Sequence, residues 1–239
     1  MINVRNSDSF FHSIPILFAV LVSLSGFVYS ASAGQADQTS IVDVVLFEAV
    51  GQFSATINKV DHLRVGELTA VEAKTGNDVT IKDLVTTLER SRAQVTFVDQ
   101  TVLRIASSSQ IEITEFMFDN SKLKNGSIKM MRGTLRSIVH RVKPGLSHFE
   151  VVTPTAVAAV RGTDFFTIVK GMVTRFVCTQ GSVEISNINP AVDGVQNCVA
   201  GQVVDVEQGK PPTTPVSADP ELIEHLMEAT EMAPPVPLG

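Results

Sequence analysis

The sequence has no tryptophan, one tyrosine and two cysteines, so its 13 phenylalanines must carry most of the aromatic packing. It also lacks a phosphate-binding Gly-rich loop, a nucleophile-elbow serine and any His or Cys set with the spacing of a metal site. His62 follows Asp61, and an Asp-His pair can orient a general base, but no nucleophile stands at a matching spacing. These absences predict a non-enzymatic protein without a cofactor or metal.

Positive charge is scarce, with 19 Lys and Arg against 25 Asp and Glu and a formal net charge of −6. No Lys or Arg follows Lys210, whereas the tail after it contains several acidic residues. An acidic chain is poorly suited to non-specific binding of nucleic acid, so we expect no nucleic-acid partner.

The apolar stretch from Ile14 to Val28 is shorter than the roughly 20 residues that a membrane-spanning helix needs. Arg5 and His12 precede it, and a small-x-small pattern ends at Ala33, before Gly34. This arrangement is typical of a secretory signal peptide over residues 1–33, cleaved between Ala33 and Gly34. We therefore expect a periplasmic or secreted protein. Membrane association is expected only under the alternative that the segment stays uncleaved as an anchor.

Downstream, short apolar alternations are separated by turn signals such as Asn125-Gly126 and Gln180-Gly181, at roughly 8–12-residue spacing. This pattern predicts an all-β fold: an antiparallel sandwich, a jelly-roll-like domain or a rolled β-solenoid. We assign residues 34–58 to a lead-in segment and residues 59–210 to the β domain.

Residues 211–239 form a Pro-rich acidic tail that differs in composition from the β domain. Asp219-Pro220 is typical of an N-cap followed by Pro at the first helical position, and Leu222 and Leu226 share one apolar side. We expect a short helix that docks on its own domain; a partner-binding helix is the alternative.

One segment stands out for its small apolar residues and its sharp polar turn. Pro154 suits the start or edge of a strand, and the small residues after it permit close approach of another backbone layer. Gly162 between Arg161 and Asp164 suits a tight turn. Both charged residues can contact a ligand. Alternatively they stabilise the turn, with Asp164 accepting hydrogen bonds from local backbone N–H groups and Arg161 paired to a carboxylate. The signature segment consists of Thr153, Pro154, Thr155, Ala156, Val157, Ala158, Ala159, Val160, Arg161, Gly162, Thr163, Asp164 and Phe165.

This signature resembles that of the FecR domain, a periplasmic all-β module, and the resemblance extends over about residues 59–210. Residues 174–185 look like the strand–Gly–strand repeat of that family. Known members are periplasmic sensors that relay a signal from an outer-membrane receptor, through a membrane helix, to a cytoplasmic anti-sigma region. Only 13 residues precede the apolar segment here, and only 29 follow Lys210, so that relay is not expected.

The resemblance therefore implies a stand-alone exported FecR domain that acts as a binding, scaffold or signal-sensing module in the bacterial envelope. The first alternative is a component of a transmembrane signalling or sigma-regulation pathway that works with a separate membrane partner through the tail helix. An envelope enzyme is the third and weakest reading.

Residues 122–143 contain seven basic residues and no acidic one. If they form strands, several basic side chains project from one sheet face and attract an envelope protein or an anionic envelope polymer. A solvated face that the acidic tail compensates is the alternative. The candidate stripe consists of Lys129, Arg132, Arg136, Arg141 and Lys143.

Cys178 and Cys198 are the only cysteines, and an even count in an oxidising compartment favours one disulfide. The alternative is a pair of buried thiols that pack as small apolar side chains.

Overall fold

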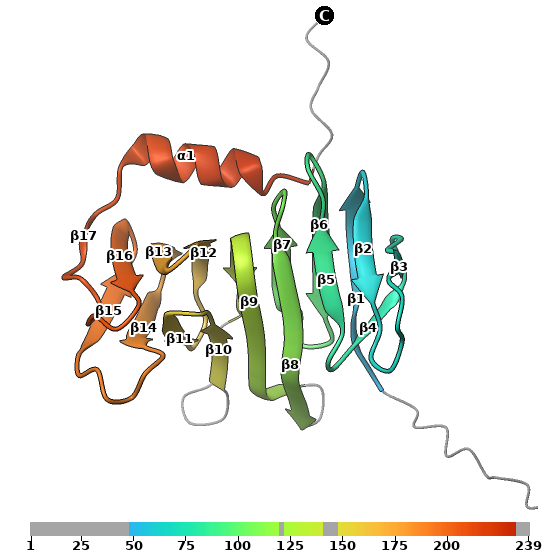
Figure 1. The fold of residues 1–239 in the computed structure, drawn as a ribbon, viewed down its shortest axis with the longest axis horizontal. Helices are drawn as coiled ribbons and strands as arrows, with labels where there is room; N and C mark the ends of the chain where they lie inside the picture. The colour runs from blue at the N-terminus through green and yellow to red at the C-terminus, as the bar shows by residue number, and fades with distance from the viewer. Residues whose placement is uncertain (1–47, 120–121, 141–147, 233–239) are drawn as a thin grey trace, which may run out of the picture. The chain divides into compact units, whose positions relative to one another are not determined.

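The structure is a computed structural model that describes residues 48–119, 122–140 and 148–232 (Figure 1). These residues form 17 strands and one short helix near the C-terminus, which confirms the predicted all-β class. The predicted signal peptide and its cleavage site at Ala33 and Gly34 lie outside the described residues, as do Arg141 and Lys143 of the candidate stripe.

Hydrogen bonding groups the strands into two open sheets that share one long strand, β9. In spatial order, sheet A contains β4 (Asp78–Thr80), β1 (Ala49–Ile57), β6 (Arg92–Phe97), β7 (Val102–Ile105), the second part of β9 (Lys122–Ile138), β12 (Asp164–Lys170), β13 (Val173–Gln180), β16 (Gln202–Glu207) and β17 (Val216–Ser217). Sheet B contains β3 (Val71–Glu72), β2 (Val60–Leu63), β5 (Leu84–Thr87), β8 (Gln110–Asp119), the first part of β9, β10 (His148–Val152), β11 (Ala156–Val160), β14 (Ser182–Asn187) and β15 (Val195–Val199).

Strand β9 passes from sheet B to sheet A and lies at the centre of both (Figure 1). Its first part pairs with β8 and, in the only parallel ladder among the described strands, with β10; its second part pairs with β7 and β12. Gly133 permits this crossing because its φ is +95° and an added Cβ would lie 2.2 Å from Ser109 Oγ. The N-terminal strands thus lie on one edge of β9 and the C-terminal strands on the other.

The core lies between the two sheets, because alternate residues of most strands are apolar and buried. In β6, for example, Ala93, Val95 and Phe97 point inward while the residues between them are partly exposed. Phe97 of sheet A stacks on Phe116 of sheet B with 4.0 Å between ring centroids, and Phe116 in turn meets Phe149 edge-on. One apolar core therefore joins the sheets as a sandwich.

Helix α1 (Pro220–Ala229) covers part of the outer face of sheet A and runs across its strands (Figure 1). Asp219 caps it by accepting the N–H of Glu221 at 2.9 Å, as the sequence predicts. Leu226 is buried against Phe166, Ile168 and Val177. The helix thus docks on its own domain. Within the described part of the chain, no helix has both the length and the apolar character needed to span a membrane.

Candidate ligand groove over the signature strand

The first part of the signature segment is held by a buried cluster of three threonines. Thr155 Oγ1 donates to Thr174 Oγ1 at 2.7 Å, and Thr174 Oγ1 donates to Thr153 Oγ1 at 2.9 Å. Thr153 Oγ1 also accepts the N–H of Ala156 at 2.9 Å. All three threonines are at most 3% exposed, so they fix the start of β11 against β13 and have no access to a ligand.

The turn after β11 is fixed by its backbone conformation, by backbone hydrogen bonds and by an ion pair with a residue of β9. Gly162 has φ +99°, and Thr163 exchanges two backbone hydrogen bonds with Val139. Asp164 accepts two hydrogen bonds from the Arg136 guanidinium, at 2.9 and 2.6 Å. The prediction that Asp164 accepts local N–H groups is therefore corrected: its carboxylate binds a β9 side chain, because both residues lie on the outer face of sheet A.

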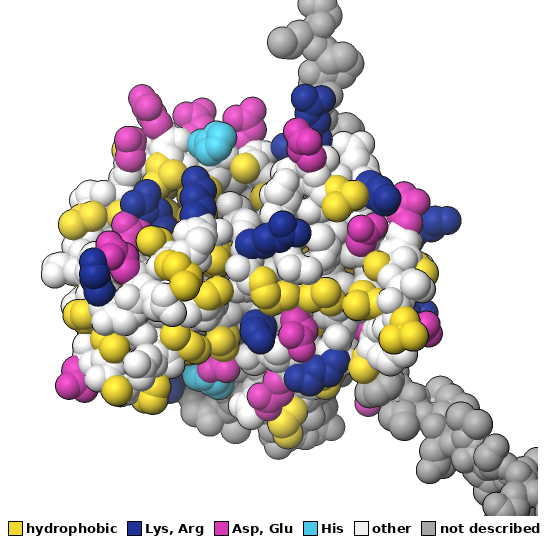
Figure 2. All heavy atoms as spheres, viewed as in Figure 1, with side chains coloured by type: hydrophobic (Ala, Val, Ile, Leu, Met, Phe, Trp, Pro, Cys, Tyr) yellow, Lys and Arg dark blue, Asp and Glu magenta, His cyan; other side chains and the backbone are white. Residues whose placement is uncertain are grey.

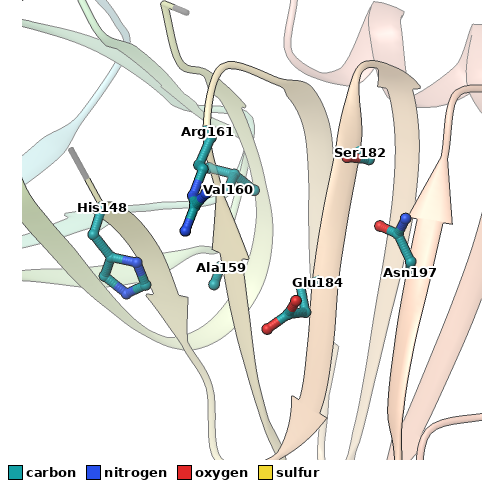
Figure 3. A pocket seen from close by; sticks show the side chains of 7 residues that line it. All are labelled: His148, Ala159, Val160, Arg161, Ser182, Glu184 and Asn197. Carbon is teal, nitrogen blue, oxygen red and sulfur yellow. The ribbon is translucent and has the colours of Figure 1, made fainter. Parts of the chain in front are cut away.

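A groove of about 390 Å³ lies over the signature strand, on the outer face of sheet B (Figure 3). The strand register places Ala159 between Glu150 of β10 and Glu184 of β14, followed by Asn197 of β15. Because Ala159 has only a methyl side chain, the longer side chains around it leave a hollow. The lining residues are His148, Ala159, Val160, Arg161, Ser182, Glu184 and Asn197.

Arg161 is exposed and, among the described residues, makes no ion pair or hydrogen bond. The prediction that it pairs with a carboxylate is therefore not met within the described part of the chain. Figure 3 shows its guanidinium and the Glu184 carboxylate on either side of Ala159. Glu184 likewise makes no ion pair or side-chain hydrogen bond with any described residue. Glu150, in contrast, accepts a hydrogen bond from Ser127 Oγ at 3.1 Å and lies 3.2 Å from His148 Nε2. The groove thus offers one guanidinium and one carboxylate to a polar ligand.

The candidate basic stripe does not form one face. Lys129 lies in the part of β9 that belongs to sheet B, and Arg136 lies in the part that belongs to sheet A. The crossing at Gly133 separates them onto opposite outer faces, and Arg132 precedes that crossing. Arg136 is moreover occupied by Asp164 and lies 5.5 Å from the centroid of the Phe166 ring. On the face seen in Figure 2, basic and acidic side chains are interspersed.

The cysteines are free, buried thiols in the structure, so the predicted disulfide is not formed there. Cys178 lies on β13 of sheet A and Cys198 on β15 of sheet B, two strands that contact each other but share no ladder. Each sulfur instead donates to backbone carbonyls, including that of Gln180 for Cys178 and that of Gln202 for Cys198. Burial raises the pKa of Cys178 to about 12 and that of Cys198 to about 11.

His62 pairs with a carboxylate that the sequence did not indicate. It points into the core, and its Nε2 lies 2.7 Å from Asp83 Oδ2, with both side chains at most 1% exposed. Asp83 also accepts from the backbone N–H groups of Val65 and Thr80 and from the Thr80 hydroxyl. Burial alone raises the pKa of Asp83, but these hydrogen bonds, with that of His62 the strongest, leave the pKa lowered. This pair is a structural anchor, and Asp61 is not part of it.

Among the described residues, no group of three or more His, Cys, Asp or Glu side chains could hold a metal ion. A second hollow, of about 370 Å³, lies between α1 and sheet A and is lined by residues that include Ile168, Lys170 and Leu226. It is part of the helix docking surface.

The family model described as FecR protein matches residues 83–184, which is less than half of the chain. Two crystal structures, at 2.50 and 1.65 Å resolution, of a Parabacteroides distasonis protein provisionally described as an anti-sigma factor are similar to the chain. In each, identity is 18%, the TM-score is 0.48, and the match covers 59% of this chain and 62% of the other. The chain thus spans less than two thirds of the length of that protein. No curated protein matches the chain.

Proposed function

We propose that this chain is a non-enzymatic sensing or binding module of the bacterial cell envelope that holds its ligand in the signature groove, and the FecR match to residues 83–184 supports this proposal. The FecR match by itself indicates a role related to signal transduction and favours a regulatory protein over a catalytic one.

The groove is proposed as the ligand site because Arg161 differs from the buried polar residues of the signature segment. Thr153, Thr155 and Asp164 are buried and satisfied by partners in the domain. Arg161 is exposed over a hollow and has no described partner. A guanidinium on a rigid strand end, with a small residue beside it, suits recognition of a carboxylate or phosphate.

The ligand that fits is an envelope protein or envelope polymer that presents an anionic group to Arg161 and a cation or hydrogen-bond donor to Glu184. The groove contains the base His148 and the hydroxyl of Ser182, but Figure 3 shows them on opposite sides, and no hydrogen bond joins them among the described contacts. This separation supports binding without turnover.

A site-specific photo-crosslinker tests the groove directly. Placed at Ser182 in the intact cell, it should give an adduct of higher mass that decreases in an Arg161→Ala background. The matched control places the same crosslinker at Val98, which is 49% exposed outside the groove. Equal adducts at the two positions, or none at Ser182, would overturn the groove, provided circular dichroism shows that both variants fold.

Export is tested separately by N-terminal sequencing of the protein recovered from the envelope. We expect the mature chain to begin at Gly34. Intact protein that still carries Met1 in the membrane fraction would instead establish an anchor, and recovery from the cytoplasm alone would refute an envelope role.

The second candidate, signalling through the tail helix to a separate membrane partner, gains no support from the described residues. The apolar side of α1 is occupied by sheet A of its own domain.

A further inference from the structure

The free edge of sheet B is formed by β15, whose five residues Val195–Val199 read Val-Gln-Asn-Cys-Val. Among the described strands, β15 pairs only with β14, so its other side carries unpaired backbone groups. Sheet edges are normally protected by short strands, charged side chains, proline or bulges. Strand β15 contains no charge and no proline, and its ladder with β14 has no register shift.

The other sheet edges in the described part of the chain are better protected. Strand β3 has two residues and ends in Glu72, β4 has three residues and begins with Asp78, and β17 has two residues. Strand β15 is thus the longest described edge and the one that lacks these devices.

The direction of the unpaired groups follows from one hydrogen bond. The N–H of Val199 donates to Gln202 Oε1 at 3.1 Å, so it does not point to β14. Since backbone groups alternate along an antiparallel strand, the N–H and C=O groups of Val195 and Asn197 point off the same edge. The side chains of Val195 and Val199 are 59% and 41% exposed, which leaves apolar surface beside these groups.

The two valines of β15, Val195 and Val199, lie symmetrically about Asn197. In an antiparallel pair of two β15 strands centred there, Val195 lies opposite Val199 of the partner subunit, and Asn197 lies opposite the partner's Asn197. No charged residue of β15 opposes a like charge, and the register pairs the free N–H groups of Val195 and Asn197 with carbonyl groups of the partner subunit. The N–H of Val199 completes the ladder by exchanging Gln202 Oε1 for a carbonyl of the partner subunit. We propose that two copies of this chain associate through antiparallel pairing of β15, which joins their B sheets across a two-fold axis.

Formation of this dimer does not require a ligand in the signature groove, but it would extend the surroundings of the groove. Asn197 both lines the groove and lies at the centre of β15. Pairing about Asn197 brings the grooves of the two copies next to each other, with the partner's Asn197 at their junction.

Sedimentation equilibrium of the purified chain over a range of concentrations tests the proposal. We expect a mass that rises to twice that of one chain, and at least a tenfold weaker association for Val199→Lys, because an edge lysine opposes strand pairing. The matched control is Val98→Lys, which adds the same charge at a valine of similar exposure outside β15 and should leave the association unchanged. A chain that remains monomeric at every concentration would overturn the proposal.

Amide hydrogen exchange distinguishes this interface from any other dimer. Association should slow exchange at Val195 and Asn197, whose amides are unpaired in a single copy. A dimer that forms equally well in Val199→Lys, with these two amides still exchanging fast, would place the interface elsewhere and refute β15 pairing. Loss of the far-ultraviolet β signal in Val199→Lys would call for Val195→Lys as the replacement variant.

Discussion

At the scale of single residues, the signature segment separates into side chains that hold the fold and one that does not. Its threonines and Asp164 form hydrogen bonds with β13, β14 and β9. Arg161 is left exposed over the groove. A mutation that removes a buried partner should therefore alter stability, and one at Arg161 should alter binding.

The Arg136–Asp164 pair should contribute strongly to stability because its side chains are only 13% and 10% exposed. Asp164→Ala leaves a largely buried guanidinium without its partner, and we expect a loss of about 3 kcal/mol in the free energy of unfolding. Asp205→Ala is the matched control, because Asp205 accepts the same two-bond contact from Arg175 at a more exposed site. It should cost under about 1 kcal/mol. Chemical denaturation measures both, and equal losses would contradict the burial argument.

The lowered pKa of Asp83 predicts that the folded protein loses stability in acid. Its pKa in the folded chain is lowered from the ordinary value of 3.8, so folding favours the ionised form. The stabilisation is complete above about pH 4 and is lost as the pH falls through the lower folded pKa. The difference in unfolding free energy between the parent and Asp83→Asn should therefore be largest near neutral pH and shrink in acid. A constant difference for Asp83→Asn down to strong acid would refute the assignment.

The two thiols should be unreactive in the folded protein. Burial raises the pKa of both, so few thiolates exist at mildly alkaline pH. An aromatic disulfide reagent should label neither cysteine before unfolding and both cysteines after unfolding without reductant. Absence of thiols in the unfolded, unreduced chain would restore the disulfide that the sequence predicts.

At the scale of elements, β9 depends on a residue without a side chain. In Gly133→Ala, the added Cβ would meet both Oγ and Cα of Ser109, at 2.2 and 2.5 Å, in a backbone conformation that L-residues avoid. We expect a loss of about 3 kcal/mol or more. Gly76→Ala is matched in φ, at +88°, but its Cβ would enter open space, so it should cost about 1 kcal/mol. Similar losses for the two variants would show that strain in φ, not the contact with Ser109, governs the crossing.

The strands and the capped helix could be predicted because their signals are local. Alternation in β6 and the Asp219-Pro220 pair each lie within a few residues. The β9 crossing could not be predicted, because it depends on Ser109 approaching Gly133 from another strand. The same applies to the groove, since Arg161, Glu184 and Asn197 come together only through the strand order.

At the scale of the whole molecule, one core cluster contains residues from β1 through β16, from Val50 to Val206. We therefore expect the two sheets to unfold together in one cooperative transition. Since the chain lacks tryptophan, circular dichroism and calorimetry are the suitable probes. The calorimetric and van't Hoff enthalpies should agree, and two separated heat-absorption peaks would contradict a shared core.

The central position of β9 also sets the order in which the chain can be completed during synthesis. When β9 leaves the ribosome, β7 and β8 are available for one of its edges, but β10 and β12 have not yet been made. The nascent chain therefore presents an unpaired edge of β9 in sheet B until β10 emerges, and in sheet A until β12 emerges. Such an edge pairs readily with other chains, so chaperone demand and aggregation should peak for fragments that end just after β9.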